Sequence, residues 1–385
     1  MNPIFAALPT TIFERMSSLA REKNAINLGQ GFPEIDGPED VRAAAARAVL
    51  EGPNQYPPML GLPELREAVA VHYERFHGLD LDWRSEVTIT SGATEALAAS
   101  IFALVSPGDE VVMFQPLYDA YEPLVRRAGG VLRTVRLTPP DWRFTEAMLA
   151  EAFSPRTKLV IFNNPLNPTG TVYSRDDLAL LASFCVRSGA VVLSDEVWEH
   201  VVFDGREHVP LIGLPGMRER TVKIGSAGKI FSLTGWKVGF VCAAPALTAV
   251  IAKAHQFLTF STPPNLQRAA AYGLGKDDDY FSSMRAALGA SRDRLAAGLR
   301  AGGYHVLESG GTYFLCIDLP ASGMALDDEE FCLRAVEDVG VAAIPVSAFY
   351  ISDPVRSIVR LCFSKTDATI DVGVRRLAAF RERLK

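Results

Sequence analysis

Between residues 86 and 194, short runs of apolar residues alternate with amphipathic stretches that have helical periodicity. This alternation predicts βαβ units, in which each strand is buried on both faces of a mostly parallel sheet. In one unit, the apolar run 159–162 is followed by a Pro/Gly-rich turn, a helical stretch over 175–187 and the apolar run 190–194. Ser174 is suited to cap this helix, and Gly189 is suited to end it. The chain is therefore expected to be an α/β protein.

The pattern changes beyond about residue 264. Two long helical stretches, 280–300 and 327–338, alternate with strand-like segments at 313–319, 341–344 and 358–363. Mixed elements of this kind indicate a second, smaller α+β domain.

Composition excludes several classes of protein. The 385 residues are 48% hydrophobic and 22% charged, with a formal net charge of −6, which is typical of a soluble globular protein. Acidic and basic residues are interspersed, so we expect neither a nucleic-acid partner nor a membrane partner. The five cysteines are widely spaced, which favours buried free thiols over disulfides. No signal peptide is visible, and the apolar run 238–252 is too short to span a bilayer, so a cytoplasmic location is expected.

The segment 225–239 is the most informative in the chain. Lys229 follows a strand-like run and lies among small residues, with Ser226 and a second cation, Lys237, close by. This set suits an aldehyde that carries a phosphate, because one amine can condense with the carbonyl while Ser226 and Lys237 hold the phosphate. Two surface lysines in a Gly/Ser loop would give the same local pattern, and the segment alone does not decide between them.

Three further segments carry candidate ligand-binding groups. The amides of Gly92, Ala93 and Thr94 open a helix directly after a strand, where a helix N-terminus can bind an anion. Asp195 ends an apolar strand, and a carboxylate in such a position is paired or functional. The Pro-rich stretch 163–170 could hold an Asn amide toward a ligand. An ordinary turn is the alternative for the first and the third of these segments.

With these motifs in this order, the sequence resembles the class I/II aminotransferases of pyridoxal phosphate (PLP) fold type I. Within that class it is most similar to the kynurenine/glutamine transaminases and their bacterial methionine aminotransferase members. The resemblance extends from residues 27–33 to 360–363. It implies a homodimer and a mostly parallel seven-stranded sheet. It also implies a large PLP-binding domain at 45–280, an N-terminal arm with part of the small domain at 1–44, and the rest of the small domain at 281–385.

The resemblance also implies a role for each matched residue. Lys229 binds PLP covalently and moves the substrate's α-proton, while Asp195 keeps the pyridine nitrogen protonated. Arg360 binds the substrate's α-carboxylate, with Gly31 and Asn167 nearby. The other cofactor contacts are Tyr118 on the ring face, Asn167 on the ring hydroxyl, the amides of Gly92, Ala93 and Thr94 with Ser226 and Lys237 on the phosphate, and Tyr56 on the phosphate of the partner subunit.

Trp198 departs from the family pattern, which usually has a tyrosine that contacts the ring hydroxyl. The indole N–H can donate a hydrogen bond, but indole is larger than phenol and cannot ionise. We hypothesise that the bound cofactor titrates at a different pH from that in typical relatives, and that turnover is lower. Lys237 is a smaller departure, because the broad class often has arginine there although the kynurenine-type group also uses lysine.

The resemblance places Phe13, Phe32, Phe260 and Phe349 around the substrate side chain. An aromatic pocket without an evident second arginine favours neutral, apolar or sulfur-containing amino acids over aspartate. Methionine, glutamine, phenylalanine and kynurenine all stay open as donors, with a 2-oxo acid as acceptor. Each of these phenylalanines could equally be an ordinary core residue.

Two rival functions and a metal site are alternatives to a transaminase site. A cysteine-S-conjugate β-lyase would use the same Lys229 and Asp195, and the sequence barely separates it from a transaminase. A non-catalytic, effector-sensing domain of a transcription regulator would need a basic DNA-binding segment that this chain does not offer. No metal is expected, because residues 196–200 resemble a zinc motif but begin with Glu196 in place of histidine, and His200 is interpreted as an interior residue.

Overall fold

The computed structural model describes residues 1–384 and contains the predicted sheet of seven strands. In spatial order the strands are β2 (Val87–Thr90), β8 (Gly239–Ala243), β7 (Thr221–Ser226), β6 (Val191–Asp195), β5 (Thr157–Asn163), β3 (Glu110–Gln115) and β4 (Val131–Arg136). The five strands from β7 to β4 are parallel, and only β8 runs antiparallel to its neighbours β2 and β7. The α/β prediction with a mostly parallel seven-stranded sheet is therefore confirmed.

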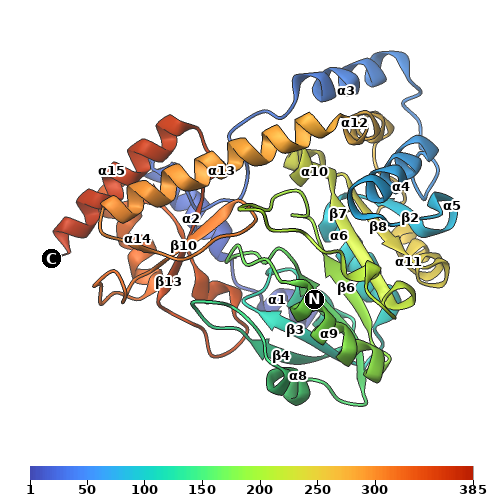
Figure 1. Cartoon of the computed structure of the whole chain (residues 1–385), viewed down its shortest axis with the longest axis horizontal. Helices are drawn as coiled ribbons and strands as arrows, with labels where there is room; N and C mark the ends of the chain where they lie inside the picture. Colours follow the sequence, from blue (N-terminus) through green and yellow to red (C-terminus); the bar gives the residue numbers. More distant parts are fainter. Residues whose placement is uncertain (385) are drawn as a thin grey trace.

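Helices cover both faces of this sheet (Figure 1). On β3, Val111 and Met113 belong to the core cluster that contains α6 residues, while Val112 and Phe114 belong to the cluster that contains α9 residues. Successive side chains of a strand point to opposite faces of the sheet. Because helices cover both faces, the side chains at every position of such a strand are buried and apolar. This burial explains why these strands have continuous apolar sequences.

Fifteen α-helices lie in the described residues, and α13 runs from the large sheet's helices to the smaller part of the molecule (Figure 1). The helices are α1 (Pro3–Ala7), α2 (Ile12–Glu22), α3 (Glu39–Glu51), α4 (Pro63–His77), α5 (Trp83–Glu86), α6 (Gly92–Leu104), α7 (Tyr121–Arg127), α8 (Glu146–Ala152), α9 (Arg175–Ser188), α10 (Ala227–Ile230), α11 (Pro245–Leu258), α12 (Pro264–Leu274), α13 (Asp278–Ala301), α14 (Asp328–Val339) and α15 (Asp367–Arg383). None of these helices combines the length and the apolar character that a bilayer crossing requires.

The boundaries of α9 follow the predicted signals. The Ser174 hydroxyl accepts a hydrogen bond from the amide of Asp177, whose carboxylate accepts one from the Ser174 amide, which makes a complete capping box. Gly189 ends the helix in the left-handed conformation at φ +71°. The chain then enters β6, which ends at Asp195. The end of α9 therefore fixes where β6 begins, and β6 places the Asp195 carboxylate at its C-terminal end.

A second sheet of four strands lies in the C-terminal part, with the order β12 (Ile344–Pro345), β13 (Ile358–Cys362), β10 (Phe314–Asp318) and β9 (His305–Val306). The segment 341–344 was predicted as one strand, and this prediction was wrong. Its first half is β11 (Val341–Ala342), which pairs in parallel with β1 (Ile26–Asn27), whereas Ile344 belongs to β12. The backbone changes partner at Ala343, which an apolar pattern cannot reveal.

Candidate active site

Three neighbouring parallel strands end at one cavity. Asn163 ends β5, Asp195 ends β6 and Ser226 ends β7, and each of these residues lines a cavity of about 210 Å³. Ligands of open α/β sheets bind at the carboxyl ends of strands, so the position itself indicates a binding site. The structure brings ten of the predicted residues into this cavity, namely Gly92, Ala93, Thr94, Tyr118, Asn167, Asp195, Trp198, Ser226, Lys229 and Lys237.

Lys229 lies on the short helix α10, directly after β7. Its Nζ atom is 4.6 Å from the centroid of the Trp198 ring, and its backbone carbonyl accepts a hydrogen bond of 2.6 Å from the Tyr313 hydroxyl. Burial lowers the pKa of the Lys229 amine to about 8, although the charge of Asp195 opposes this shift. The neutral form of the amine, which a nucleophile or base requires, is therefore far more populated near physiological pH than it is for an ordinary lysine.

Asp195 is only 5% exposed, and its carboxylate is held by hydrogen bonds. The Tyr121 hydroxyl donates to Oδ2 over 2.6 Å, and the Val197 amide donates to Oδ1 over 3.4 Å. Burial raises the pKa of Asp195, while the hydrogen bond from Tyr121 and the charge of Lys229 oppose the rise. An acceptor in this setting can hold a protonated nitrogen of a ligand in place.

The part of the cavity lining formed by the start of helix α6, Lys237 and Ser226 is suited to an anion. Helix α6 begins at Gly92, whose φ of +76° is a conformation that residues with a side chain rarely adopt. A Cβ atom on Gly92 would lie 3.3 Å from Cε of Lys237, so the glycine also lets this lysine approach the helix N-terminus. Backbone amides at a helix N-terminus, a lysine and the Ser226 hydroxyl together form a site for a phosphate.

A second cavity, of about 350 Å³, adjoins the first and shares Tyr118, Asn167, Trp198 and Lys229 with it. Arg360 lies in its wall, where one guanidinium nitrogen donates to Asn167 Oδ1 over 2.9 Å and another donates to the Gly29 carbonyl over 2.7 Å.

Several aromatic rings surround the Arg360 guanidinium. Its carbon is 3.9 Å from the ring centroid of Phe314, 5.0 Å from that of Phe349 and 5.4 Å from that of Phe13. Burial lowers the pKa of Arg360 to about 10, so the side chain stays cationic at physiological pH. The buried Nε atom has no hydrogen-bond partner among the described residues, which leaves a donor for an anionic ligand.

The remaining predicted substrate residues are placed in different ways. Gly31, Phe13 and Phe32 line the second cavity, while Phe349 is buried behind it against Arg360 and Phe13. A Cβ atom at Gly31 would come within 2.4 Å of the Phe314 ring, so only glycine fits between this ring and the cavity.

Tyr56 and Phe260 line neither cavity of the single chain. Their rings pack against each other, with centroids 5.5 Å apart, and they are 84% and 38% exposed. Their predicted roles at a cofactor phosphate and in the substrate pocket stay predictions, because any such contact would have to be made outside the single chain.

Several residues of the site were not predicted from the sequence, and four of these hold predicted residues in place. Tyr121 holds Asp195, Tyr313 holds the Lys229 carbonyl and Phe314 stacks on Arg360. Asn163 accepts from the Asn167 amide over 2.8 Å and donates to the Asp195 carbonyl over 2.8 Å. Tyr121 lies three positions after the predicted Tyr118, which was the only available signal. The others hold predicted residues in place through contacts that a sequence pattern does not reveal.

The model of the aminotransferase class I and II family matches residues 23–377 of the chain. This match covers far more than half of the sequence. The chain belongs to the class I and II aminotransferases. It is a PLP-dependent transaminase, because the family depends on this cofactor, and the non-catalytic alternative is thereby set aside.

Individual relatives agree with this membership. The chain is 43% identical to methionine aminotransferase of Escherichia coli, with 96% of each protein covered, and 35% identical to mouse kynurenine–oxoglutarate transaminase 1, with 94% and 93% covered. It is similar to the structure of N-succinyldiaminopimelate aminotransferase from Mycobacterium tuberculosis, with 45% identity, a TM-score of 0.95, and 98% of this chain and 99% of that chain covered. The likeness confirms the predicted fold type I and the similarity to the kynurenine and methionine transaminases.

The residues of the first cavity fit PLP. A cation and a helix N-terminus lie where a phosphate would bind, a nucleophilic amine lies where an aldehyde would react, and a buried carboxylate is available for a ring nitrogen. The cavity lining thus matches the chemical groups of the family's cofactor one by one.

Proposed function

We propose that this transaminase takes its amino group from a neutral amino acid with an apolar or sulfur-containing side chain, such as methionine, and passes it to a 2-oxo acid. The charge of the second cavity is the observation that supports this proposal. Its described lining contains Phe13, Phe32 and Phe314, whereas its only cations are Arg360 and Lys229. Asp119 adds a carboxylate to the same wall, which disfavours a second anionic group on the substrate.

We further propose a role for each group in the reaction. When it is bound, PLP supplies an electron sink for the carbanion formed at the substrate's α-carbon. The Lys229 amine, whose pKa is lowered, would take the proton from that carbon and deliver it to the cofactor's aldehyde carbon. The amino group would then stay with the cofactor, and water would release the substrate as a 2-oxo acid. Asp195 would accept a hydrogen bond from the ring nitrogen, Tyr118 would pack on the ring face, and Asn167, beside Trp198, would donate to the ring hydroxyl.

Two binding clamps fix the orientation. The amides of Gly92, Ala93 and Thr94, with Ser226 and Lys237, hold the phosphate end, and Arg360 holds the substrate's α-carboxylate beside Gly31. With both ends fixed, the α-proton lies close to Lys229 and the reacting atoms are oriented before reaction.

N-succinyldiaminopimelate is a second candidate donor, because a structure with that name in its title is 45% identical to this chain. Such a donor carries carboxylates besides the one that Arg360 would bind. Besides Arg360 and the cofactor-binding Lys229, the described lining of the second cavity has no cation that could pair with these additional carboxylates. The carboxylate of Asp119 would repel them. We therefore place this donor second.

Steady-state kinetics with 2-oxoglutarate as acceptor test the choice. We expect kcat/KM for methionine to exceed that for N-succinyldiaminopimelate by at least about tenfold, because an unpaired anion at the site costs more than about 1.4 kcal/mol. Asp119→Asn should raise kcat/KM for the anionic donor severalfold and leave that for methionine nearly unchanged. A preference for N-succinyldiaminopimelate would overturn the proposal. Pyruvate and ammonia formed from a cysteine S-conjugate without acceptor would identify the β-lyase alternative.

We also propose that the chain forms a homodimer in which Tyr56 reaches the phosphate of the other subunit. The support is an exposed aromatic group, since Tyr56, Phe257 and Phe260 are 84%, 86% and 38% exposed. Large exposed apolar side chains that gather on a surface mark an interface. Phe260 would then contribute to the substrate pocket from this interface.

Three smaller proposals complete the description. We propose a domain division with boundaries near residues 44 and 280, supported by the separate locations of the seven-stranded and four-stranded sheets and by the pairing of β1 with β11. A cytoplasmic location is supported by the five cysteines, all of which are free and buried. Small-molecule amino and oxo acids are the proposed partners.

A further inference from the structure

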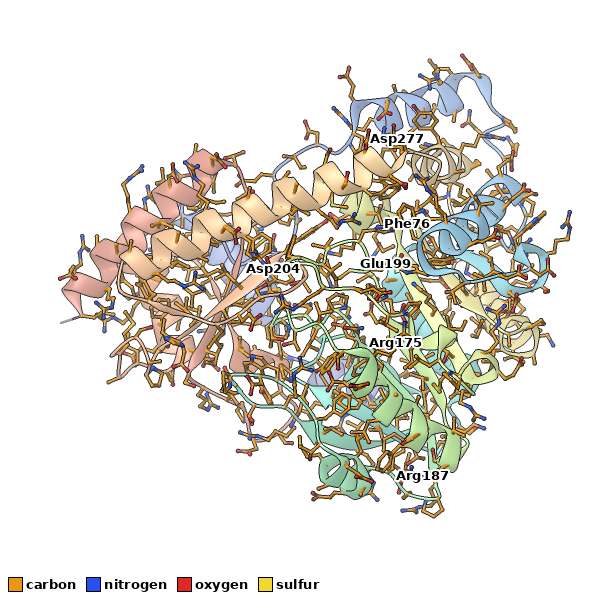
Figure 2. The ribbon with its side chains drawn as sticks, viewed as in Figure 1. Phe76, Arg175, Arg187, Glu199, Asp204 and Asp277 are labelled. Atoms are coloured by element: carbon orange, nitrogen blue, oxygen red, sulfur yellow. The ribbon has the colours of Figure 1, made fainter. Side chains whose placement is uncertain are left out.

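A buried group of titratable side chains lies on the other side of the segment that carries Asp195 and Trp198. These two residues line the cofactor cavity, whereas Glu196, Glu199 and His200 of the same segment lie in a buried cluster beside helix α4. Figure 2 labels Glu199 and Phe76 of this helix, and the Phe76 ring packs against that of His200. The proposed reaction uses none of the residues in this cluster.

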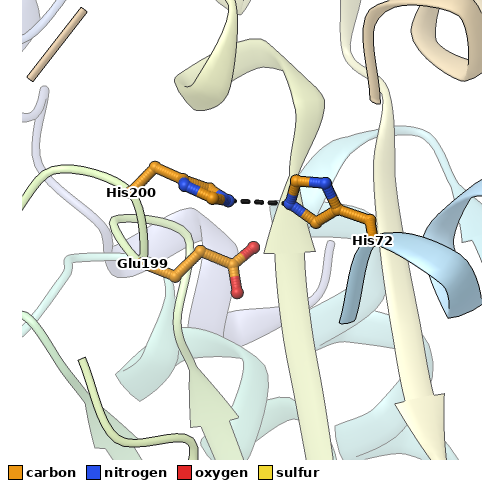
Figure 3. Close-up of side chains that lie close together, drawn as sticks. All are labelled: His72, Glu199 and His200. Carbon is orange, nitrogen blue, oxygen red and sulfur yellow. Dashed lines mark hydrogen bonds between the residues drawn. The ribbon is translucent and has the colours of Figure 1, made fainter. Parts of the chain in front are cut away.

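Two histidines of the cluster point their ring nitrogens at each other. His72 of α4 and His200 are 128 positions apart in the sequence, yet their Nε2 atoms are 2.7 Å apart. Figure 3 shows the Glu199 carboxylate beside the line that joins the two rings. One ligand atom from each of the three residues lies within 4.8 Å of the other two, and all three residues are buried. Two imidazoles and a carboxylate form a ligand set that binds zinc.

A third imidazole, that of His77, borders this group. His77 ends helix α4, and its side chain is 7% exposed. Its Nε2 atom lies 3.4 Å from Glu199 Oε2 but has no hydrogen-bond partner by geometry. This imidazole therefore interacts with the carboxylate of the group.

The charges in the cluster favour a cation. The ammonium of Lys223 lies 2.5 Å from Glu199 Oε2 and 3.2 Å from Glu196 Oε2. These carboxylates also contact the Tyr73 hydroxyl, and His77 and His208, which add positive charge only when they are protonated. One ammonium against two carboxylates leaves an excess negative charge in a buried place, which is unfavourable. Lys223 already occupies the position between Glu196 and Glu199, which leaves the position between His72, His200 and Glu199 for a further cation.

The surroundings are suited to a tightly held ion. The rings of Phe76 and Phe281 lie 4.7 Å and 5.4 Å from the His72 ring, and they lie 4.9 Å and 4.8 Å from the His200 ring. An apolar shell of this kind excludes water and strengthens the bonds between a metal and its ligands. In tetrahedral zinc sites with Zn–N bonds of about 2.0–2.1 Å, ligand nitrogens are about 3.3 Å apart, so the two Nε2 atoms would have to separate by about 0.6 Å.

We propose that His72, His200 and Glu199 bind one divalent transition-metal ion of the Zn²⁺ type. The ion fixes the segment 195–200 from behind and thereby holds Asp195 and Trp198 in the cofactor cavity. Nitrogen ligands favour Zn²⁺ over Mg²⁺ or Ca²⁺. The expectation of no metal considered only the local motif, which lacks a first histidine. The structure supplies that histidine from α4.

Zinc retention by the tag-free holoenzyme tests the proposal. After chelation, reloading with Zn²⁺ and dialysis, elemental analysis should find one zinc per chain, and zinc should raise the Tm. His72→Gln and His200→Asn should each weaken zinc binding at least about tenfold and abolish the Tm rise. The exposed His305→Asn variant is the matched control and should behave as wild type.

The competing explanation is an ordinary hydrogen bond in which one imidazole N–H donates to the other ring. In that case the wild type retains no more zinc than His72→Gln does, and this result overturns the proposal. If neither variant folds, X-ray absorption at the zinc edge of the loaded wild type decides without a variant. Scattering from two imidazoles and one carboxylate supports the site, and any ligand shell without imidazole contradicts it.

Discussion

The hydroxyl of Tyr121 donates to the carboxylate of Asp195 over 2.6 Å, inside a core where both side chains are buried. This bond opposes the effect of burial, which raises the pKa of Asp195. The carboxylate that the cofactor's ring nitrogen needs is therefore stabilised by a residue that does not itself line the cavity.

Removal of this hydroxyl should weaken cofactor binding. In Tyr121→Phe the pKa of Asp195 rises further, so the carboxylate becomes protonated at a higher pH and PLP affinity is lost earlier as the pH falls. A hydrogen bond to a charged group contributes about 1.5–3 kcal/mol, which corresponds to about a tenfold to hundredfold weaker affinity. Equilibrium dialysis of PLP across a pH series measures this change.

Tyr173→Phe is the control for this experiment, because its buried hydroxyl donates to the Trp142 carbonyl over 2.9 Å, away from the site. It should leave PLP affinity unchanged. Equal affinity of Tyr121→Phe and wild type at every pH would show that Tyr121 does not support the carboxylate.

The reaction of the apoprotein with PLP should depend on pH in a way set by Lys229. Burial disfavours the ammonium form, so the proton leaves at a pKa of about 8, below the ordinary value of 10.5. The rate of cofactor attachment should rise with pH, be half-maximal near pH 8 and become level about one pH unit higher. Stopped-flow absorbance measures this profile. In Asp195→Asn the midpoint should move lower still, because the carboxylate that favours the ammonium is gone. A rate that keeps rising to pH 10 contradicts the account.

Arg360→Lys should impair recognition of the α-carboxylate. Lysine lacks the planar fork that donates to Asn167 and Gly29 and stacks on Phe314. The loss of a charged hydrogen bond predicts a fall in kcat/KM for methionine on the order of a hundredfold. Arg356→Lys, at an exposed position outside the site, is the control and should keep the wild-type kcat/KM for methionine. The amine analogue of methionine without its carboxylate should react equally with Arg360→Lys and wild type, and a large difference there would refute this role.

Trp198→Tyr tests the departure from the family pattern. The Trp198 ring lies 4.6 Å from Lys229 Nζ, and it packs edge-on against Tyr313 with centroids 4.5 Å apart. A phenol can both donate to the cofactor's ring oxygen and ionise, whereas indole cannot ionise. We expect the absorbance of the bound cofactor to titrate at a different pH in the variant and turnover to rise. Superimposable titration curves would exclude any such influence of Trp198.

Local features of the fold were predictable because their causes are local. The cap at Ser174 and the left-handed end at Gly189 depend on neighbouring backbone groups, so the sequence of α9 is sufficient to predict both. The division of 341–344 between two sheets depends on β1 and β13, which lie far away in the sequence.

The site divides in the same way. Lys229, Asp195 and Arg360 lie in recognisable motifs, and the structure gathers them around two adjoining cavities. The contact of His72 with His200 joins segments that no motif connects, and the position of Tyr56 depends on a second chain in our proposal. Tyr121, Tyr313 and Phe314 were not predicted, because each of them supports a site residue through a tertiary contact that no sequence motif encodes.

The absorption spectrum of the purified protein with PLP, before and after addition of methionine and beside Lys229→Ala, tests the central claim most directly. We predict a visible band in the wild type that methionine bleaches. In the variant, the band should be altered and turnover should be at least about 10²- to 10⁴-fold lower. Failure of the wild type to take up PLP, or a Lys229→Ala variant with the same spectrum and the same response to methionine, would contradict the claim that Lys229 carries the chemistry.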